Sequence, residues 1–210
     1  EIAGTRKLTP AVKWQENLAA ITTLKELERT GRQSTQKELE VLKRFSGFGS
    51  LPQVFDENNE QWAERRNQLK ALLTKEEYDS LEESTLSAHY TSPEIIKAMY
   101  AALEQFGVKG GNILEPSMGN GAFFAHMPPS FRENSKLYGV ELNTVTGRIA
   151  QQLFPEASIE VKGFEDTKFQ DKFFDAVIGN IPFGNFKLYD PKYNSMNLLI
   201  HDYFFVKGLD

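Results

Sequence analysis

Apolar residues in the first part of the chain recur every three or four positions, which is the spacing of one face of an α-helix. One such stripe consists of Trp14, Leu18, Ile21 and Leu24. Glutamate, glutamine, lysine and arginine are frequent between the stripes, so each helix has a solvated side and an apolar side that needs a second surface. The pattern predicts a helical extension over residues 1–87 that packs on the domain that follows it.

Residues with the chemistry of helix caps mark where several helices begin. Thr35 with Glu38, and Thr74 with Glu77, have the spacing of a capping box, in which each side chain bonds the other residue's backbone N–H. Ser92-Pro93 combines a capping hydroxyl with a proline that suits the first helical turn. These signals predict helix starts at residues 36, 75 and 93.

From residue 88 onward, short apolar runs alternate with helical patterns. Four runs have the length of buried strands and cover residues 112–116, 137–141, 158–161 and 175–178. Strands that alternate with helices indicate an α/β domain with a parallel, doubly wound sheet, here over residues 88–210. Ligands of such sheets bind beyond the carboxyl ends of the strands, so the turns that follow these runs are the candidate site.

Composition narrows the class of protein. The chain has 210 residues, of which 40% are hydrophobic and 25% charged, and this balance is typical of a soluble globular protein. It has no cysteine and three scattered histidines, so we expect neither a disulfide nor a metal site. No signal peptide or membrane span is recognisable, and we expect a cytoplasmic protein. The net charge of −5 argues against a free-standing nucleic-acid binder, but not against a catalytic module.

Three of the turns carry residue types suited to a nucleotide or a planar amine. Gly119-Asn120-Gly121 follows the first strand, and its glycines let a ligand approach the backbone, although a plain tight turn is the alternative. Glu141 ends the second strand, where an acid commonly binds the two hydroxyls of a ribose. After the fourth strand, Asn180 and Ile181 offer a side-chain and a backbone carbonyl beside the flat face of Phe183. That turn suits a planar amino group.

In combination, these motifs resemble those of the amino-group DNA methyltransferases. The resemblance rests on residues 90–93, 115–123, 141, 163–166 and 180–183, in an order that places the cofactor motifs before the catalytic one. It is closer to the adenine-specific methylase modules of large helicase–methylase proteins of phages and conjugative elements, and it covers residues 88–210. It implies a Rossmann-like methyltransferase fold and methyl transfer to the N6 amino group of adenine in DNA.

The resemblance implies S-adenosylmethionine as the cofactor. The residues it assigns to the cofactor site are Tyr90, Thr91, Pro93, Glu115, Pro116, Ser117, Gly119, Asn120, Gly121, Glu141, Phe164, Glu165 and Asp166. Residues 90–93 and 115–121 would line the methionine and ribose, and Glu141 would hold the ribose hydroxyls. Phe164 would pack on the adenine, whose amino group would bond to Glu165 or Asp166.

It assigns catalysis to Asn180, Ile181, Pro182 and Phe183. The lone pair of an exocyclic amine is delocalised into the base, and acceptors on both N–H groups favour a more tetrahedral, more nucleophilic nitrogen. Phe183 would stack on a base that is flipped out or single-stranded. The family commonly has a proline where this chain has Ile181, but the carbonyl acceptor remains.

The expected sheet is smaller than that of the family. The sequence shows four strands where the family has about seven, and no target-recognition domain is visible, so we expect an incomplete core that works beside further target-recognition and helicase domains. Two other functions stay open. One is a methylase-like binding module without turnover, and the other is an N-methyltransferase that acts on protein glutamine or on RNA.

Overall fold

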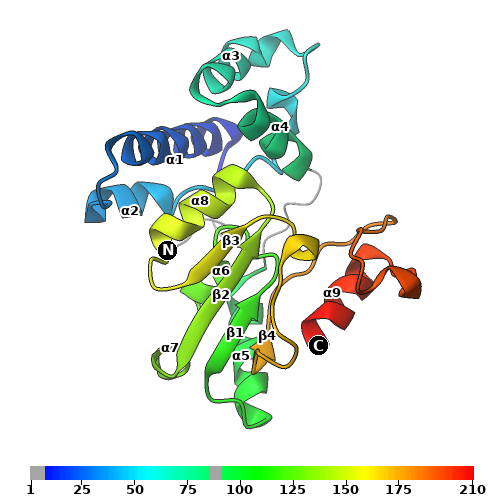
Figure 1. Ribbon diagram of the computed structural model, residues 1–210. Coiled ribbons are helices and arrows are strands. Elements are labelled where there is room, and N and C mark those ends of the chain that lie inside the picture. The colour runs from blue at the N-terminus through cyan, green and yellow to red at the C-terminus, as the bar shows by residue number, and fades with distance from the viewer. Residues whose placement is uncertain (1–7, 86–90) are drawn as a thin grey trace.

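The computed structural model of the chain describes residues 8–85 and 91–210. Its first segment is helical, as the apolar stripes predict (Figure 1). The elements of this segment are α1 (Pro10–Thr30), α2 (Gln36–Leu42), η1 (Pro52–Val54), η2 (Glu60–Trp62), α3 (Ala63–Leu72) and α4 (Lys75–Ser84). We call residues 8–85 the helical extension. The predicted domain boundary at residues 87 and 88 lies outside the described residues, as does Tyr90.

The predicted helix starts are confirmed. Thr35 and Glu38 form a capping box at α2, and Thr74 and Glu77 form one at α4, each with both reciprocal hydrogen bonds. Ser92 caps α5 (Pro93–Gln105) and accepts a hydrogen bond from the N–H of Ile95 at 3.5 Å. These short-range signals act within one helical turn, which is why sequence alone locates them.

The second segment contains a parallel four-stranded sheet with the order β3-β2-β1-β4, and the Rossmann-like prediction is confirmed. The strands are β1 (Gly111–Glu115), β2 (Ser135–Glu141), β3 (Ser158–Val161) and β4 (Ala176–Val177). Strand β4 is shorter than the predicted run of residues 175–178. On either side of it, the N–H of Asp175 donates to the carbonyl of Asn112 and the N–H of Ile178 donates to the carbonyl of Leu114, each at 2.9 Å and each within β1.

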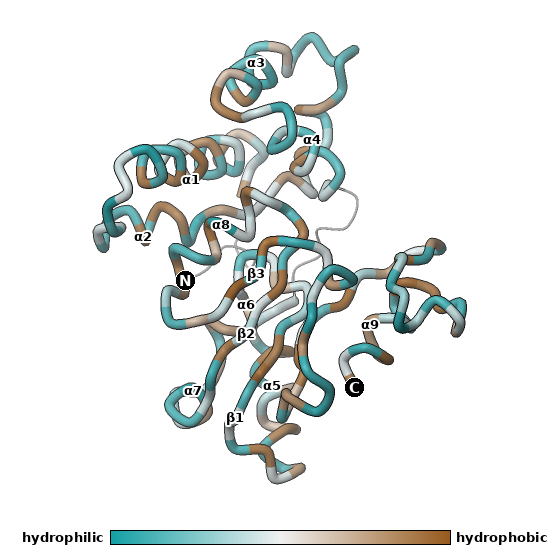
Figure 2. The backbone as a smooth tube through the Cα atoms, in the orientation of Figure 1, coloured by the Kyte–Doolittle hydropathy of each residue, from teal (hydrophilic) through white to brown (hydrophobic). Residues whose placement is uncertain are grey.

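Helices cover both faces of the sheet (Figure 1). One face packs against α5 and the elements α6 (Ala122–Ala125), α7 (Pro129–Glu133) and α8 (Thr144–Leu153), whereas the other packs against α9 (Ile200–Leu209). Successive strand residues serve opposite faces: Ile113 and Leu137 face the first group of helices, and Leu114 and Val140 face α9. Figure 2 shows the hydrophobic stretches that run along the strands.

Helix α8 joins the helical extension to the sheet. Val145 and Ile149, both fully buried, belong to the apolar core of the extension, while Ala150 belongs to the core beneath the sheet. Arg148 on the same helix pairs with Glu77 and with Glu28, at 3.0 Å from the latter. The predicted packing of the extension on the following domain is therefore made through α8.

Two helices of the sheet segment begin at residues that periodicity alone does not give. Helix α8 begins at Thr144 because the side chain of Asn143 accepts a hydrogen bond from the N–H of Thr146 at 2.9 Å. The sequence pattern from Asn197 to about Leu209 predicts a helix, but helix α9 begins only at Ile200, because Asn197 has a left-handed backbone with φ of 55° and follows the short turn η4 (Asn194–Met196).

Candidate active site

A cavity of about 460 Å³ opens at the carboxyl ends of the strands. It gathers residues from all four strand ends and from the helical extension. Among the residues predicted for the site, those that line it are Thr91, Glu115, Pro116, Ser117, Gly119, Asn120, Glu141, Phe164, Glu165, Asn180, Ile181, Pro182 and Phe183. Pro93, Gly121 and Asp166 do not line it.

The glycine loop after β1 is held against the end of β2. The N–H of Met118 donates to the carbonyl of Val140 at 2.9 Å. Gly119 has φ of 55°, and a side chain there would project into open space, so the cavity reaches its backbone. Gly121 has φ of 80°, and an added Cβ would collide with the ring of Phe154. The two glycines therefore serve different needs: the first borders the cavity and the second lets the loop pack on α8 and its C-cap.

Glu141 is fixed by two backbone amides at the end of β2. Its Oε2 accepts from the N–H of Gly119 at 2.7 Å, and its Oε1 accepts from the N–H of Asn143 at 2.8 Å. Burial raises the pKa of this carboxyl, and the two backbone hydrogen bonds oppose that rise. Each oxygen retains acceptor capacity, so the carboxylate can take two hydroxyl donors from a ligand in the cavity.

Glu115 is a buried carboxyl with an orphaned oxygen. It is 1% exposed, and its Oε2 has no hydrogen-bond partner. Burial, together with the nearby charge of Glu141, raises its pKa well above the usual value. A cationic or hydrogen-donating group of a ligand would satisfy this oxygen, because Glu115 lines the cavity.

The turn after β4 lies directly beside Glu115. A Cβ added at Gly179 would stand 3.4 Å from Cγ of Glu115 and 3.5 Å from Cδ of Pro116. Beyond Gly179, the cavity wall continues through residues 180–183. Phe183 leaves 69% of its surface exposed, and its ring lies tilted against that of His201, with the centroids 6.3 Å apart. The turn thus places Asn180, Ile181 and the exposed ring of Phe183 in the wall of one cavity.

The turn after β3 forms a further wall of the cavity. Phe164 is 3% exposed and begins the short helix η3 (Phe164–Asp166). Of the two acids that could follow it into the site, Glu165 is half-buried and lines the cavity, whereas Asp166 is exposed and does not. The geometry therefore favours Glu165 as the carboxylate within reach of a ligand.

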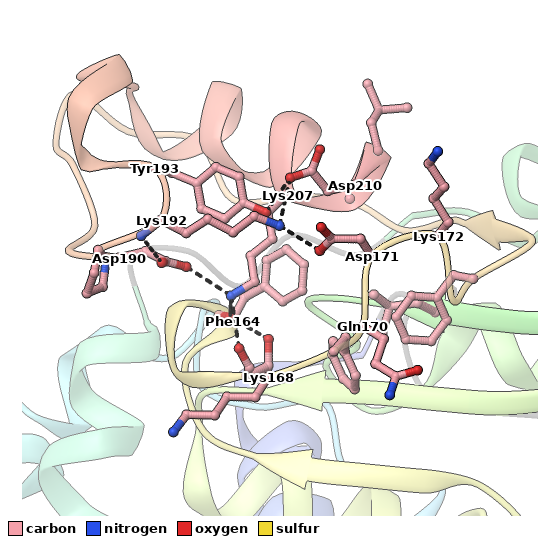
Figure 3. Close-up of a pocket in the computed structure, with 17 residues that line it drawn as sticks. Phe164, Lys168, Gln170, Asp171, Lys172, Asp190, Lys192, Tyr193, Lys207 and Asp210 are labelled. Atoms are coloured by element: carbon pink, nitrogen blue, oxygen red, sulfur yellow. Dashed lines mark hydrogen bonds and ion pairs between the residues drawn. The ribbon is translucent and has the colours of Figure 1, made fainter.

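Phe164 also contacts a cluster of polar side chains formed by Lys207, Asp190 and Tyr203 (Figure 3). Lys207 Nζ donates to the carbonyl of Phe164 at 2.7 Å, pairs with Asp190 at 3.0 Å and stands 4.9 Å from the centre of the Phe164 ring. Burial alone would raise the pKa of Asp190, but hydrogen bonds from Tyr203 and Lys207 outweigh it and lower that pKa. The cluster fixes the wall that Phe164 provides.

The cluster borders a second cavity of about 350 Å³ between α9 and the segment after η3 (Figure 3). Five of its charged groups pair with one another: Lys192 binds Asp171 at 2.6 Å and Asp210 at 3.0 Å, and Lys207 binds Asp190. Phe164 lines both cavities. Leu114 of β1 lines the second cavity, but the glycine loop and the turns that follow β1, β2 and β4 line only the first. We therefore place the candidate active site in the first cavity.

The helical extension supplies part of the first cavity, which sequence reasoning did not anticipate. The lining residues that it contributes are Gly47, Ser80, Glu83 and Ser84. The side-chain amide of Asn120 donates to the carbonyl of Phe45 at 3.2 Å, and that of Asn143 donates to the carbonyl of Ser80 at 2.7 Å. The glycine loop and the end of β2 are therefore tied to the extension.

Two exposed apolar side chains that sequence reasoning missed also line the cavity. Leu142, which is 68% exposed, directly follows Glu141, and Phe186, which is 54% exposed, follows the turn that carries Phe183. A large apolar residue right after a strand-ending acid was a usable signal for Leu142. Phe186 gave no comparable signal, because it lies outside every periodic pattern.

The described residues contain neither a candidate metal site nor a candidate membrane-spanning helix. No group of three or more histidine, aspartate or glutamate side chains is arranged to hold a metal ion in residues 8–85 and 91–210. Within the same ranges, no helix has the length and hydropathy needed to span a membrane.

Comparison with known proteins gives one family match. The model of the family described as N-6 DNA methylase matches residues 74–205. Over 102 residues the chain is 34% identical to the Defense against restriction protein B of Escherichia phage P1, a match that covers 48% of this chain and 4% of that protein.

Solved structures with a similar arrangement include two bacterial proteins. One, from Listeria monocytogenes, is assigned as a class I S-adenosylmethionine-dependent methyltransferase, with 17% identity and a TM-score of 0.46 over 93% of this chain and 69% of that one. The other is a type I restriction-modification methyltransferase subunit from Streptococcus thermophilus, with 16% identity and a TM-score of 0.42 over 84% of this chain and 47% of that one.

Proposed function

The chain belongs to the N-6 DNA methylase family, and we propose that it transfers a methyl group from S-adenosylmethionine to the N6 amino group of an adenine in DNA. One observation carries the proposal: the turn at residues 180–183, the glycine loop and Glu141 line the same cavity. A donor held by the loop and Glu141 and an amine held by the turn would therefore meet.

The residues of the cavity fit S-adenosylmethionine. Glu141 would accept the two ribose hydroxyls, and Phe164 with Leu142 would provide apolar surface for the adenine. Glu165 would accept from the adenine amino group. The orphaned Oε2 of Glu115 would take the ammonium group of the methionine moiety, which gives a buried carboxylate the partner it lacks. When bound, this cofactor supplies an activated methyl group on a sulfonium.

The turn after β4 would prepare the amine. The side-chain oxygen of Asn180 and the carbonyl of Ile181 would each accept one N–H of the target amino group, which directs the nitrogen lone pair toward the methyl donor. These acceptors would also stabilise the positive charge that grows on the nitrogen as the N–C bond forms and the methyl–sulfur bond of the donor breaks. The methylated nitrogen would then release one N–H proton to solvent, and the donor would leave as the neutral thioether. Phe183 would stack on the base and hold it in position.

Asn180→Ala tests this mechanism. The substitution removes one acceptor and leaves the cofactor wall intact, so we expect methyl transfer to DNA to fall about 100-fold or more while cofactor affinity is preserved. Transfer of a labelled methyl group to DNA and calorimetric titration with the cofactor measure the two quantities. Full activity in Asn180→Ala would contradict the proposed role of the turn.

The same labelling assay separates the other candidate substrates. Glutamine-containing protein and RNA are offered in parallel with DNA, because an amide or amino group of either could occupy the turn. Methylation of one of these in preference to DNA would replace the proposed substrate, and cofactor binding without transfer to any of them would indicate a binding module.

We further propose that the module acts within a larger DNA-modifying protein in the cytoplasm of a bacterial host. The matched phage protein is named for defence against restriction, and this chain spans 4% of its length. Adenine methylation protects DNA from restriction enzymes that cut only unmethylated sites, and the other domains of such a protein would supply target recognition and strand separation.

A further inference from the structure

Two exposed phenylalanine rings stand at the mouth of the cavity. Phe183 is 69% exposed and Phe186 is 54% exposed, and both line the cavity that contains Asn180. A single exposed aromatic residue is ordinary on a protein surface. Two at the mouth of one cavity, three residues apart and next to the proposed amine-binding turn, form a surface suited to flat ligands.

The ring of Phe186 lies against the backbone of Gly184, and about half of its surface faces solvent. A Cβ added at Gly184 would collide with Cε1 of Phe186, and the backbone of Gly184 does not adopt a left-handed conformation that would itself require glycine. The absent side chain thus leaves room for the Phe186 ring. The N–H of Ile200 donates to the carbonyl of Phe186 at 3.0 Å and fixes the backbone. Because the backbone is fixed and the ring packs on Gly184, less entropy is lost when a ligand stacks on it.

We propose that Phe183 and Phe186 form a stacking platform for two successive unpaired bases, with the target adenine on Phe183 and its neighbour on Phe186. The substrate is then DNA whose target strand is single-stranded around the adenine. This inference rests on the proposed function, because it takes residues 180–183 as the target-base site.

The neighbouring base decides the substrate class. In a duplex with one flipped base, the adjacent base remains stacked and paired inside the helix, so a second ring at the cavity mouth has nothing to bind. In a single strand, each base can leave its neighbours and stack on an aromatic side chain. Lys187, an exposed residue next to Phe186, donates to the side-chain oxygen of Asn197, and its positive charge would attract a phosphate of the bound strand.

The experiment compares variants in binding to two forms of one DNA. The probe is a fluorescein-labelled oligonucleotide with a single adenine, used alone and annealed to its complement, with S-adenosylhomocysteine present. We expect Phe186→Ala to weaken single-strand binding about 5- to 150-fold, as the loss of one stacked base predicts. The duplex, in which the ring has no base to stack on, should be affected much less.

Two further variants test the geometry. Gly184→Ala leaves Phe186 in the sequence but displaces its ring, so it should weaken single-strand binding in the same direction. Phe186→Trp, which keeps an aromatic face, should retain binding. Phe106 is 83% exposed and remote from the cavity, so Phe106→Ala is the matched control and should bind like the wild type. Cofactor affinity and melting temperature of each variant show whether the fold is intact.

The inference is overturned if Phe186→Ala binds single strands like Phe106→Ala, or if it loses single-strand and duplex binding equally. A wild-type protein that methylates DNA while Phe186→Ala binds normally would leave the proposed function standing without the stacking platform. Conversely, single-strand binding that depends on Phe186 without any methyl transfer to DNA would count against the proposed function alone.

Discussion

The carboxyl group of Glu115 has an unsatisfied oxygen at the base of the cavity, and this has two opposing effects. Without a ligand, a buried charge beside Glu141 destabilises the folded chain. With a cationic ligand, the same charge strengthens binding, because a hydrogen bond between charged groups in a buried site is stronger than a neutral one. Stability and affinity should therefore respond in opposite directions to the loss of this charge.

We expect Glu115→Gln to raise the free energy of unfolding by about 1–3 kcal/mol at pH 8 and to weaken S-adenosylmethionine binding about 10- to 150-fold. The raised pKa sets the pH dependence. The folded state holds the proton at pH values where the unfolded state has released it, so wild-type stability falls as pH rises from the usual carboxyl pKa toward the folded-state value. The stability gain of Glu115→Gln should therefore grow over that range.

Urea denaturation at several pH values and calorimetric titration measure the two effects, and Glu104→Gln, on α5 and outside the cavity lining, is the control. A variant that loses stability at pH 8 would contradict the destabilising role of the charge. Unchanged cofactor affinity would contradict the proposed contact with the ammonium group.

At the level of single residues, sequence reasoning located residues that line the cavity, but not the long-range hydrogen bonds that hold them. The turn at residues 180–183, Glu141 and Glu115 were found because acids and amides at strand ends are conspicuous. Asn120 was predicted as a cofactor contact and does line the cavity, but the bond from its side-chain amide to the carbonyl of Phe45, 75 positions earlier in the chain, was not predicted. A contact of that range depends on how two segments pack, which no local pattern reports.

Helix α8 shows how one element can serve two parts of the molecule. Its N-cap, Asn143, is 3% exposed and performs two tasks: its oxygen accepts from the N–H of Thr146, and its nitrogen donates to the carbonyl of Ser80 on α4. The first task starts the helix and the second ties it to the extension. Both tasks depend on a single amide group beside Glu141.

We expect Asn143→Ala to destabilise the protein by about 1–2 kcal/mol, because it removes a cap and leaves the Ser80 carbonyl without its donor. Asn143→Ser is the informative comparison, since serine caps helices about as well as asparagine but is too short to reach Ser80. It should recover the capping part of the loss. Chemical denaturation gives both values, and equal stability of the two variants would show that capping contributes nothing measurable here.

Among the elements, the helix starts with a capping box were predictable, and so were the four strands. Their signals lie within a few residues, as with Thr74 and Glu77. The start of α9 was not, because the left-handed Asn197 interrupts a sequence that otherwise looks helical. The shortness of β4 was also hidden, since strand length depends on the partner strand as well as on the apolar run.

At the scale of the whole molecule, the shared core around α8 predicts a single cooperative unfolding transition. Both tryptophans of the chain, Trp14 and Trp62, lie in the helical extension, so their fluorescence reports on that part alone. S-adenosylmethionine binding would report on the cavity at the strand ends. Because Val145 and Ile149 are buried against the extension, neither part can lose its structure without exposing the core of the other.

We therefore expect tryptophan fluorescence, circular dichroism and loss of cofactor binding to share one midpoint in urea. Val145→Ala, which opens a gap in the shared core, should lower all three midpoints together, whereas Val12→Ala, at an exposed position of α1, should change them little. Separate midpoints for fluorescence and cofactor binding would show that the extension melts independently.

The position of α8 also bears on how such a protein can be recombined. A seam between the helical extension and the sheet runs along the face of α8 that carries Val145, Arg148 and Ile149. A chimera that exchanges residues 8–85 for those of a relative would bring foreign side chains against a native α8. Grafts that carry residues 143–153 along with the extension keep the seam inside one parent, and those are the crossovers we expect to yield folded hybrids.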